Sequence, residues 1–284
     1  MINNYFRKKI IILLLCLVIF LPSNCVKPKE GNKGNTLCIV EMFHAVWLNR
    51  GHFTQAYIEL GAELDSNKVQ FIQYYVESTA DHPFPRLSCR ESEDRMKYYM
   101  EDAGLPTIFF NGVLKIRGTP TGLEDNTYKS RVDIVKEKML ENISIVNSYT
   151  SPIKISGSCL NIESNTYQID INVEALDNIE FNDLRLFIAL TENNIPFVAI
   201  NGTKIHPFVF REFIKPEEMK DKNGIEGIPI TLSKTGDKHE TSFSFDLNTE
   251  LYKKELNIVA FVQDYTKKII LQGYGITLNN EINN

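Results

Sequence analysis

The chain has 284 residues and a formal net charge of −5, with 43% hydrophobic and 24% charged residues, a composition typical of globular proteins. Its length favours two domains over one. The acidic balance argues against nucleic acid as a partner, because binding a phosphate backbone requires a basic surface.

Residues 1–24 have the pattern of an export signal. Three basic residues at positions 7–9 precede an apolar run over residues 10–21. This run is shorter than the roughly 20 apolar residues that a membrane-spanning helix needs. We therefore expect a cleaved signal peptide; an uncleaved N-terminal anchor is the alternative.

Cys25 follows the signal at the place where a lipoprotein signal peptidase would cut. Residues 21–25 (Leu-Pro-Ser-Asn-Cys) resemble a lipobox, although Pro22 and Asn24 are not its usual residues. We expect lipidation of Cys25, with palmitate among its acyl chains, and a polar tether over residues 25–35. Because Val26 is not the Asp that some bacteria use for inner-membrane retention, the outer membrane is favoured, in either its periplasmic or its surface-exposed face.

Residues 36–149 alternate between strand and helix patterns. The expected elements are a strand over 36–43, a helix over 52–64, a strand over 69–76, a helix capped by Ser92 and ending near 103, two strands over 107–110 and 113–117, and a helix over 126–147. Asn111-Gly112 between the two short strands predicts a tight hairpin, because both central positions need positive φ.

This order, β-α-β-α-β-β-α, resembles that of a thioredoxin domain. Residues 41–43 (Glu-Met-Phe), Trp47 and the helix that follows are similar to the start of thioredoxin-fold lipoproteins, and residues 105–112 look like the cis-proline strand and hairpin of that fold. Together with the Asp-His-Pro-Phe stretch at 81–84 and Arg95…Tyr98-Tyr99, they resemble the Bacteroidetes-type thioredoxin-like outer-membrane lipoprotein family. The resemblance implies a thioredoxin-like domain followed by a β-sandwich.

The redox cysteines of such a domain are missing. Redox members carry Cys-x-x-Cys after the tryptophan, whereas the aligned positions here are Leu48 and Gly51. The reaction needs a thiolate at a helix N-terminus and a second thiol to resolve the mixed disulfide. We therefore expect no dithiol chemistry at Trp47, Leu48, Gly51 and Pro106, the degenerate redox-site positions.

Three other cysteines remain in the body of the chain. Cys38 falls within a predicted buried strand, Cys89 falls in a loop, and Cys159 lies in the second half. A single reactive thiol at Cys89 or Cys38 is the alternative to an inert site, and a disulfide between these two is also open.

Metal and cofactor binding have little support. His44, His52 and His82 could approach one end of the domain, and residues 217–226 carry four acidic side chains, but neither set has the spacing of a known ligand pattern. The chain has no phosphate-binding glycine loop and no hydrolase motif. We expect neither metal nor cofactor, and a role that is not enzymatic.

The end of the domain beside the predicted cis-proline could still bind a peptide. Trp47, the only tryptophan, would line a groove there with Leu48, Leu105 and Pro106, and an exposed tryptophan suits a contact surface. Packing of Trp47 on the first helix is the alternative.

Residues 150–284 lose the helical pattern and show short runs typical of strands. These runs lie at 153–159, 167–175, 184–191, 197–200, 208–214, 228–232, 240–247, 256–264 and 269–276. They favour an immunoglobulin-like antiparallel β-sandwich. The sequence thus predicts an envelope lipoprotein that is held to the membrane through Cys25. It would bind an unidentified envelope protein or peptide, or have a structural role.

Overall fold

The computed structural model describes residues 34–76, 87–100, 104–118, 127–219, 225–248 and 255–279. The predicted signal peptide, Cys25, His82 and most of the predicted tether lie outside these ranges. None of the described helices combines the length and the apolar character that crossing a membrane requires.

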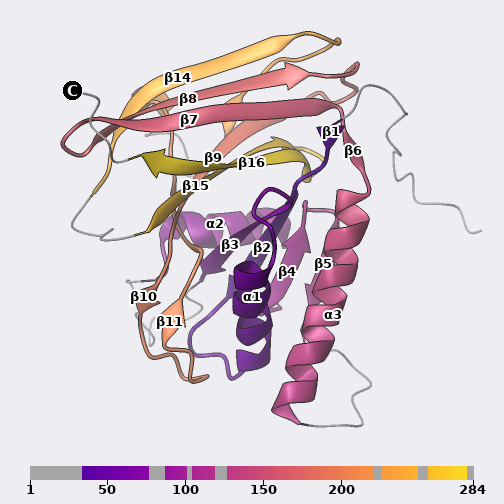
Figure 1. The fold of residues 1–284 in the computed structure, drawn as a ribbon, viewed down its shortest axis with the longest axis vertical. Coiled ribbons are helices and arrows are strands. Elements are labelled where there is room, and N and C mark those ends of the chain that lie inside the picture. Colours follow the sequence, from indigo (N-terminus) through magenta and orange to yellow (C-terminus); the bar gives the residue numbers. More distant parts are fainter. Residues whose placement is uncertain are drawn as a thin grey trace, which may run out of the picture.

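The first half of the chain forms a mixed sheet with helices on its faces (Figure 1). Its elements are β1 (Gly34–Asn35), β2 (Cys38–His44), α1 (Gly51–Glu63), β3 (Val69–Tyr75), α2 (Arg90–Tyr99), β4 (Thr107–Phe110), β5 (Leu114–Arg117), α3 (Tyr128–Asn147) and β6 (Thr150–Ser151). The strands lie in the order β3-β2-β4-β5, with β2 parallel to β3 and antiparallel to β4.

The Asn111-Gly112 turn joins β4 to β5 as expected, with φ of 47° at Asn111 and 72° at Gly112. The Asn111 side chain also holds neighbouring strands, because its Oδ1 accepts from the Ile39 N–H at 2.6 Å and its Nδ2 donates to the Ile270 carbonyl at 3.2 Å. A methyl group on Gly112 would come 1.9 Å from the Lys268 carbonyl oxygen, so this position needs glycine for space as well as for its φ.

The second half of the chain is all strand apart from one short 3-10 helix, over its described residues. Its strands are β7 (Ile153–Glu163), β8 (Thr166–Ala175), β9 (Leu184–Glu192), β10 (Ile195–Pro196), β11 (Ile205–His206), β12 (Val209–Phe213), β13 (Ile228–Pro229), β14 (Lys238–Asp246), β15 (Leu256–Asp264) and β16 (Ile269–Asn279). Most neighbours are antiparallel, whereas β16 pairs with β7 in parallel.

Strand β12 joins the two halves into one continuous sheet. It pairs with β9 of the second half and, in parallel, with β3 of the first half through Val209 and Gln73. The path runs β14-β8-β7-β16-β15-β9-β12-β3-β2-β4-β5, with β13 paired to β9 beside it.

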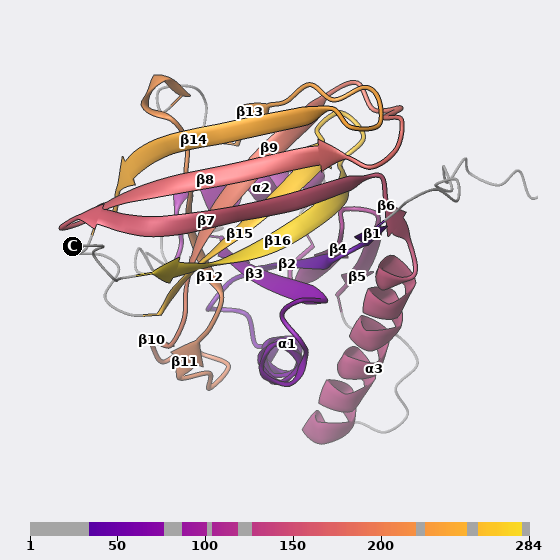
Figure 2. The ribbon, with the colours of Figure 1, turned by 45° about the horizontal axis from the view of Figure 1, so that its top comes forward.

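The sheet folds back on itself, so the molecule is layered (Figures 1 and 2). Helices α1 and α3 cover one face of β3-β2-β4-β5. Helix α2 lies against the other face, together with strands β12, β9, β15 and β16. Strands β7, β8 and β14 form the outermost layer. Alternation along β9 divides its side chains between two cores. Leu186 and Ile188 point into the core of the second half, whereas Phe187 and Ala189 face the first half.

Candidate functional site

The loop between β2 and α1 holds the positions where a redox dithiol would stand. Helix α1 begins at Gly51, and its N-cap residue, Arg50, makes no side-chain capping bond. Leu48 therefore lies three residues before the helix, away from the first turn, where a helix dipole would act on a thiol. Trp47 and Leu48 are half-buried and Gly51 is buried.

Pro106 lies beside this loop, at the start of β4. The Leu105–Pro106 peptide bond is cis, and Thr107, the next residue, pairs with Phe43 at the end of β2. Pro106 is buried, while Leu105 is half-buried and packs against the aromatic core between the two halves. Of the side chains expected to line a peptide groove, Trp47, Leu48 and Leu105 thus keep part of their surface exposed.

A hairpin from the second half covers the loop. It is formed by β10, β11 and the turn between them, and the Ile200 N–H donates to the Val46 carbonyl at 3.2 Å. Three of its apolar side chains are exposed: Val198 by 73%, Ile200 by 65% and Ile205 by 46%. We call these three residues, with Trp47 and Leu48, the hairpin surface.

Buried polar groups fix the hairpin to the first half. Asn201 Nδ2 donates to His44 Nε2 at 3.4 Å, and Tyr75 and His206 are bonded at 2.6 Å between hydroxyl and Nδ1. His206 Nε2 donates to the Phe197 carbonyl at 2.9 Å, so Nδ1 accepts from Tyr75 in the neutral imidazole. This network is the reason that the hairpin keeps its place over the loop.

Both of these histidines are held neutral. Burial and the nearby His206 lower the pKa of His44 to about 3, and burial lowers the pKa of His206. Among the described residues, no group of three or more His, Cys, Asp or Glu side chains could hold a metal ion. His44 and His52 are both buried, and of the acidic stretch the structure describes Glu217 and Glu218, which lie in the 3-10 helix.

The three described cysteines are free thiols in protected positions. Cys38 and Cys159 are buried, and burial raises the pKa of both, that of Cys159 to about 12. Cys89 is half-buried, and burial raises its pKa as well, although Ser92 opposes this shift by hydrogen bonding. A reactive thiol needs a lowered pKa, so these environments disfavour nucleophilic sulfur.

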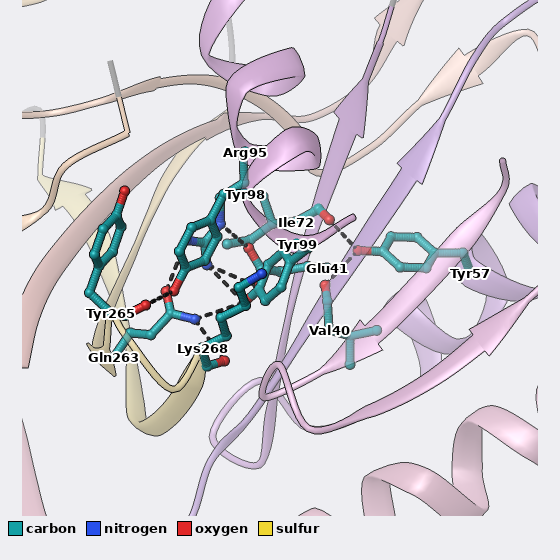
Figure 3. Close-up of polar contacts among 10 residues, drawn as sticks. All are labelled: Val40, Glu41, Tyr57, Ile72, Arg95, Tyr98, Tyr99, Gln263, Tyr265 and Lys268. Carbon is teal, nitrogen blue, oxygen red and sulfur yellow. Dashed lines mark hydrogen bonds and ion pairs between the residues drawn. The ribbon is translucent and has the colours of Figure 1, made fainter. Parts of the chain in front are cut away.

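A buried ion pair lies on the opposite side of β2 from α1 (Figure 3). Arg95 of α2 binds the Glu41 carboxylate with both groups fully buried, through Nε–Oε1 at 2.9 Å and Nη2–Oε2 at 3.2 Å. Tyr99 donates to Glu41 Oε2 at 2.7 Å, and Arg95 Nη1 donates to Gln263 of β15 at 2.9 Å. Burial lowers the pKa of Arg95, but Glu41 and its neighbours more than offset this, so the pKa stays above its usual range.

Aromatic rings from both halves enclose the Arg95 guanidinium. Its central carbon lies 4.7 Å from the ring centre of Tyr99, 4.9 Å from that of Phe187 and 5.3 Å from that of Phe261. Tyr98 stacks on Tyr265 at 4.8 Å between ring centres. The ion pair is fully buried, and its contacts come from both halves of the chain.

Sequence reasoning named Trp47 and Leu48 but missed the hairpin side chains of this surface, because residues 197–200 were expected to form a strand. The signal for the ion pair was visible: Glu41 interrupts an otherwise apolar strand, and a carboxylate in that position needs a buried cation. Its partner could not be deduced from spacing, since Arg95 is 54 residues away.

The sequence matches no family model and no curated protein. Several solved structures are similar to it at low identity. HBP35 of Porphyromonas gingivalis is 14% identical, with a TM-score of 0.61 over 89% of this chain and 79% of that one. Two further structures are more distant. A domain of the outer-membrane lipoprotein Omp28 from the same organism is 14% identical, with a TM-score of 0.32 over 46% of this chain and 91% of that one. A protein of Agrobacterium tumefaciens is 12% identical, with a TM-score of 0.47 over 89% of this chain and 97% of that one.

Proposed function

We propose that this chain is a lipid-anchored envelope protein whose first half is a thioredoxin-like domain without redox activity, and that it binds another envelope protein. Residues 36–149 would be the thioredoxin-like domain and residues 150–284 the β-sandwich domain. The fold shared with HBP35 supports the pairing of two such halves in one chain.

The thioredoxin-like assignment is supported by the strand order β3-β2-β4-β5 with α1 and α3 on one face and α2 on the other. The order of the elements is the one that the resemblance implies. Pro106 at the start of β4, next to the end of β2, has the expected place beside the altered loop.

The observation that carries the proposal is the lack of sulfur at the mouth of α1. Leu48 and Gly51 hold the two positions, and burial raises the pKa of all three described thiols. A domain with this loop would keep the scaffold of a redox protein without the pair of thiols that forms and resolves a mixed disulfide at this site.

Insulin reduction tests this point. The purified body, residues 26–284, should show no reduction of insulin above the dithiothreitol background, and Cys89→Ser should leave that result unchanged. Catalysed reduction that Cys89→Ser abolishes would overturn the proposal and establish the single-thiol alternative.

Lipid anchoring is supported by the sequence around Cys25. Cells fed radiolabelled palmitate should label the wild-type chain, and Cys25→Ser should remove the label and release the protein from the membrane fraction. A labelled Cys25→Ser chain would contradict the assignment, and Cys16→Ser is the matched control.

Protein binding is supported by the hairpin surface, because several exposed apolar side chains on one hairpin are typical of contact sites. A photo-cross-linking residue at position 200 should trap a partner in intact cells. Ile162, which is 49% exposed on β7, is the matched control position. Equal products from both positions, or none from position 200, would exclude this surface.

A further inference from the structure

Strand β14 is the last strand of the outermost layer and has one unpaired side, which we call its free edge. It is 9 residues long and pairs with β8 from Lys238–Glu174 to Asp246–Thr166. Among the described strands, β8 is its only partner. Figures 1 and 2 show β14 at the border of the layer β7-β8-β14.

Strand β14 lacks the features that usually protect an edge strand. Natural edge strands tend to be short, bulged or interrupted by proline, because unpaired backbone groups invite pairing with another chain. The opposite end of the sheet follows this rule, since β5 has 4 residues and carries Lys115 and Arg117 at its surface. Strand β14 has no proline, and its register with β8 is unbroken. Such an edge suits recognition by strand addition.

The backbone groups on the free edge belong to alternate residues. Just before β14, the Asp237 carbonyl accepts from the Ala175 N–H at 2.8 Å. Just after it, the Leu247 N–H donates to the Asn165 carbonyl at 2.9 Å. Odd-numbered residues therefore turn toward β8, and by the alternation of an antiparallel ladder the even-numbered ones turn away from it. These are exposed residues that no other described backbone segment pairs with on that side: Lys238, Glu240, Ser242, Ser244 and Asp246.

We propose that two copies of this protein pair along β14, antiparallel, about a two-fold axis at Ser242. Each copy would extend the β7-β8-β14 layer of the other. With the axis at Ser242 the strands overlap over their whole length, and each even-numbered residue meets an even-numbered residue of the second copy. The pairs would exchange about ten backbone hydrogen bonds, a number typical of a specific interface. The interface is isologous, so one surface serves both copies.

The charges of the strand favour a second copy in this register. Lys238 would lie opposite Asp246 of the second copy, and the two-fold axis repeats this contact at the other end. Opposite charges across an antiparallel pair stabilise it, whereas like charges destabilise it. Glu240 would meet Ser244 of the second copy, so no like charges face each other directly. An axis one residue away, at Thr241, would place Lys238 opposite Ser244 and lose both charge contacts.

The inner face of the strand adds apolar contacts in the same register. Phe243 is half-buried and packs against the core of the second half. In the paired strands it would lie opposite Thr241 of the second copy, which would cover more of its ring. Pairs of aromatic and β-branched side chains stabilise antiparallel strands. This association uses no residue of the hairpin surface and does not depend on the proposed partner binding.

Sedimentation equilibrium of the body, residues 26–284, measures the association. The wild-type body should pass from monomer to dimer as its concentration rises. Glu240→Pro removes one N–H of the free edge, and proline is tolerated in an edge strand where the N–H faces solvent, so this variant should fold and remain a monomer. Glu240→Ala keeps that N–H and is the matched control, which should dimerise like wild type. Circular dichroism confirms that both variants are folded.

A charge exchange tests the register. Lys238→Glu would place two carboxylates opposite each other at both ends, and Asp246→Lys would do the same with two ammonium groups. Each variant alone should therefore dimerise about tenfold more weakly than wild type. An equal mixture of the two should recover the dimer, because opposite charges then meet at both ends.

A disulfide tests the position of the axis. The Cα atoms of a hydrogen-bonded antiparallel pair lie about 5.5 Å apart, which a disulfide can span. Ser242→Cys should therefore link two copies under mild oxidation. Ser158→Cys, exposed on β7, is the matched control and should not link them.

Three results would overturn the proposal: a body that stays monomeric up to millimolar concentration, a dimer that Glu240→Pro leaves intact, or charge variants that do not recover on mixing. A dimer that Ile200→Asn abolishes and Glu240→Pro does not would assign self-association to the hairpin surface. A monomeric body whose Ser242→Cys variant is linked to a different protein in cells would assign the edge to a strand of that protein.

Discussion

Replacing Arg95 with methionine should be among the most destabilising single changes in this protein. The substitution leaves the Glu41 carboxylate fully buried without its cation, although the Tyr99 hydroxyl still donates to it. Breaking a buried pair by removing one partner typically costs about 3–5 kcal/mol, because an uncompensated charge remains. Methionine keeps apolar contact with the surrounding rings, so the loss reports on the charge rather than on a cavity.

The same reasoning predicts that the losses will not add. In the double variant Glu41→Gln/Arg95→Met no buried charge is left, and the introduced glutamine can still bond Tyr99, so most of the lost stability should return. We expect a coupling energy of about 2–4 kcal/mol between the two positions.

Urea unfolding of the four proteins, followed by circular dichroism and by the fluorescence of Trp47, measures the cycle. Coincident transitions from the two probes are required before the energies are compared. In thermal scans a loss of about 4 kcal/mol corresponds to roughly 8–16 °C for a chain of this size. A loss under about 1 kcal/mol for Arg95→Met, or losses that simply add in the double variant, would refute the reasoning.

Buried or crowded groups give three further predictions. The pKa of His44 is about 3 in the folded protein against 6.5 in the unfolded chain, so the free energy of unfolding should fall as pH falls from 6.5 toward 3, by about 1.4 kcal/mol per pH unit. Glu91, whose pKa is raised to about 7 chiefly by burial, changes the free energy of unfolding with pH in the opposite direction. The difference between wild type and His44→Gln in the slope of this free energy against pH therefore isolates the histidine, and equal slopes would contradict the prediction. Gly112→Ala should lower the free energy of unfolding in urea by about 2–4 kcal/mol, because it adds a backbone clash to a positive φ. Gly236→Ala, where φ is 88° and the space around the added methyl group is open, should lower it by only about 1 kcal/mol. Similar losses for both variants would contradict the steric argument. Cys38, Cys89 and Cys159 should react with Ellman's reagent far more slowly in the native protein than in urea, and fast labelling of native Cys89 would show that it is accessible.

The element order of the first half could be predicted because local signals there agree. Asn111-Gly112 specified the hairpin through its need for positive φ, and the apolar stripe of residues 128–147 specified α3. The start of α2 was placed wrongly at Ser92: the N-cap residue is Cys89, and Ser92 is buried within the first turn. Serine is the better cap by propensity, but packing of α2 against the strands decided the boundary.

Long-range features could not be predicted in this way. Residues 197–200 were expected to form a strand, yet they lie in the turn between β10 and β11 with Val198 and Ile200 exposed. Hydrophobicity alone does not distinguish a buried strand from an exposed contact surface. The pairing of β12 with β3 also leaves no local trace, because the residues that meet, Val209 and Gln73, are far apart in the chain.

The short strand pair β1–β6 fixes the point at which an anchored chain would enter the body of the protein. Gly34 and Asn35 pair with Ser151 and Thr150, at the boundary between the two halves, so a pull on the chain before Gly34 would act at this boundary and be shared by both halves. In both views β1 lies at the end of the molecule opposite β10 and β11 (Figures 1 and 2). In the proposed anchored form the chain would thus enter the body away from β10 and β11, and the anchor itself would leave the hairpin surface uncovered.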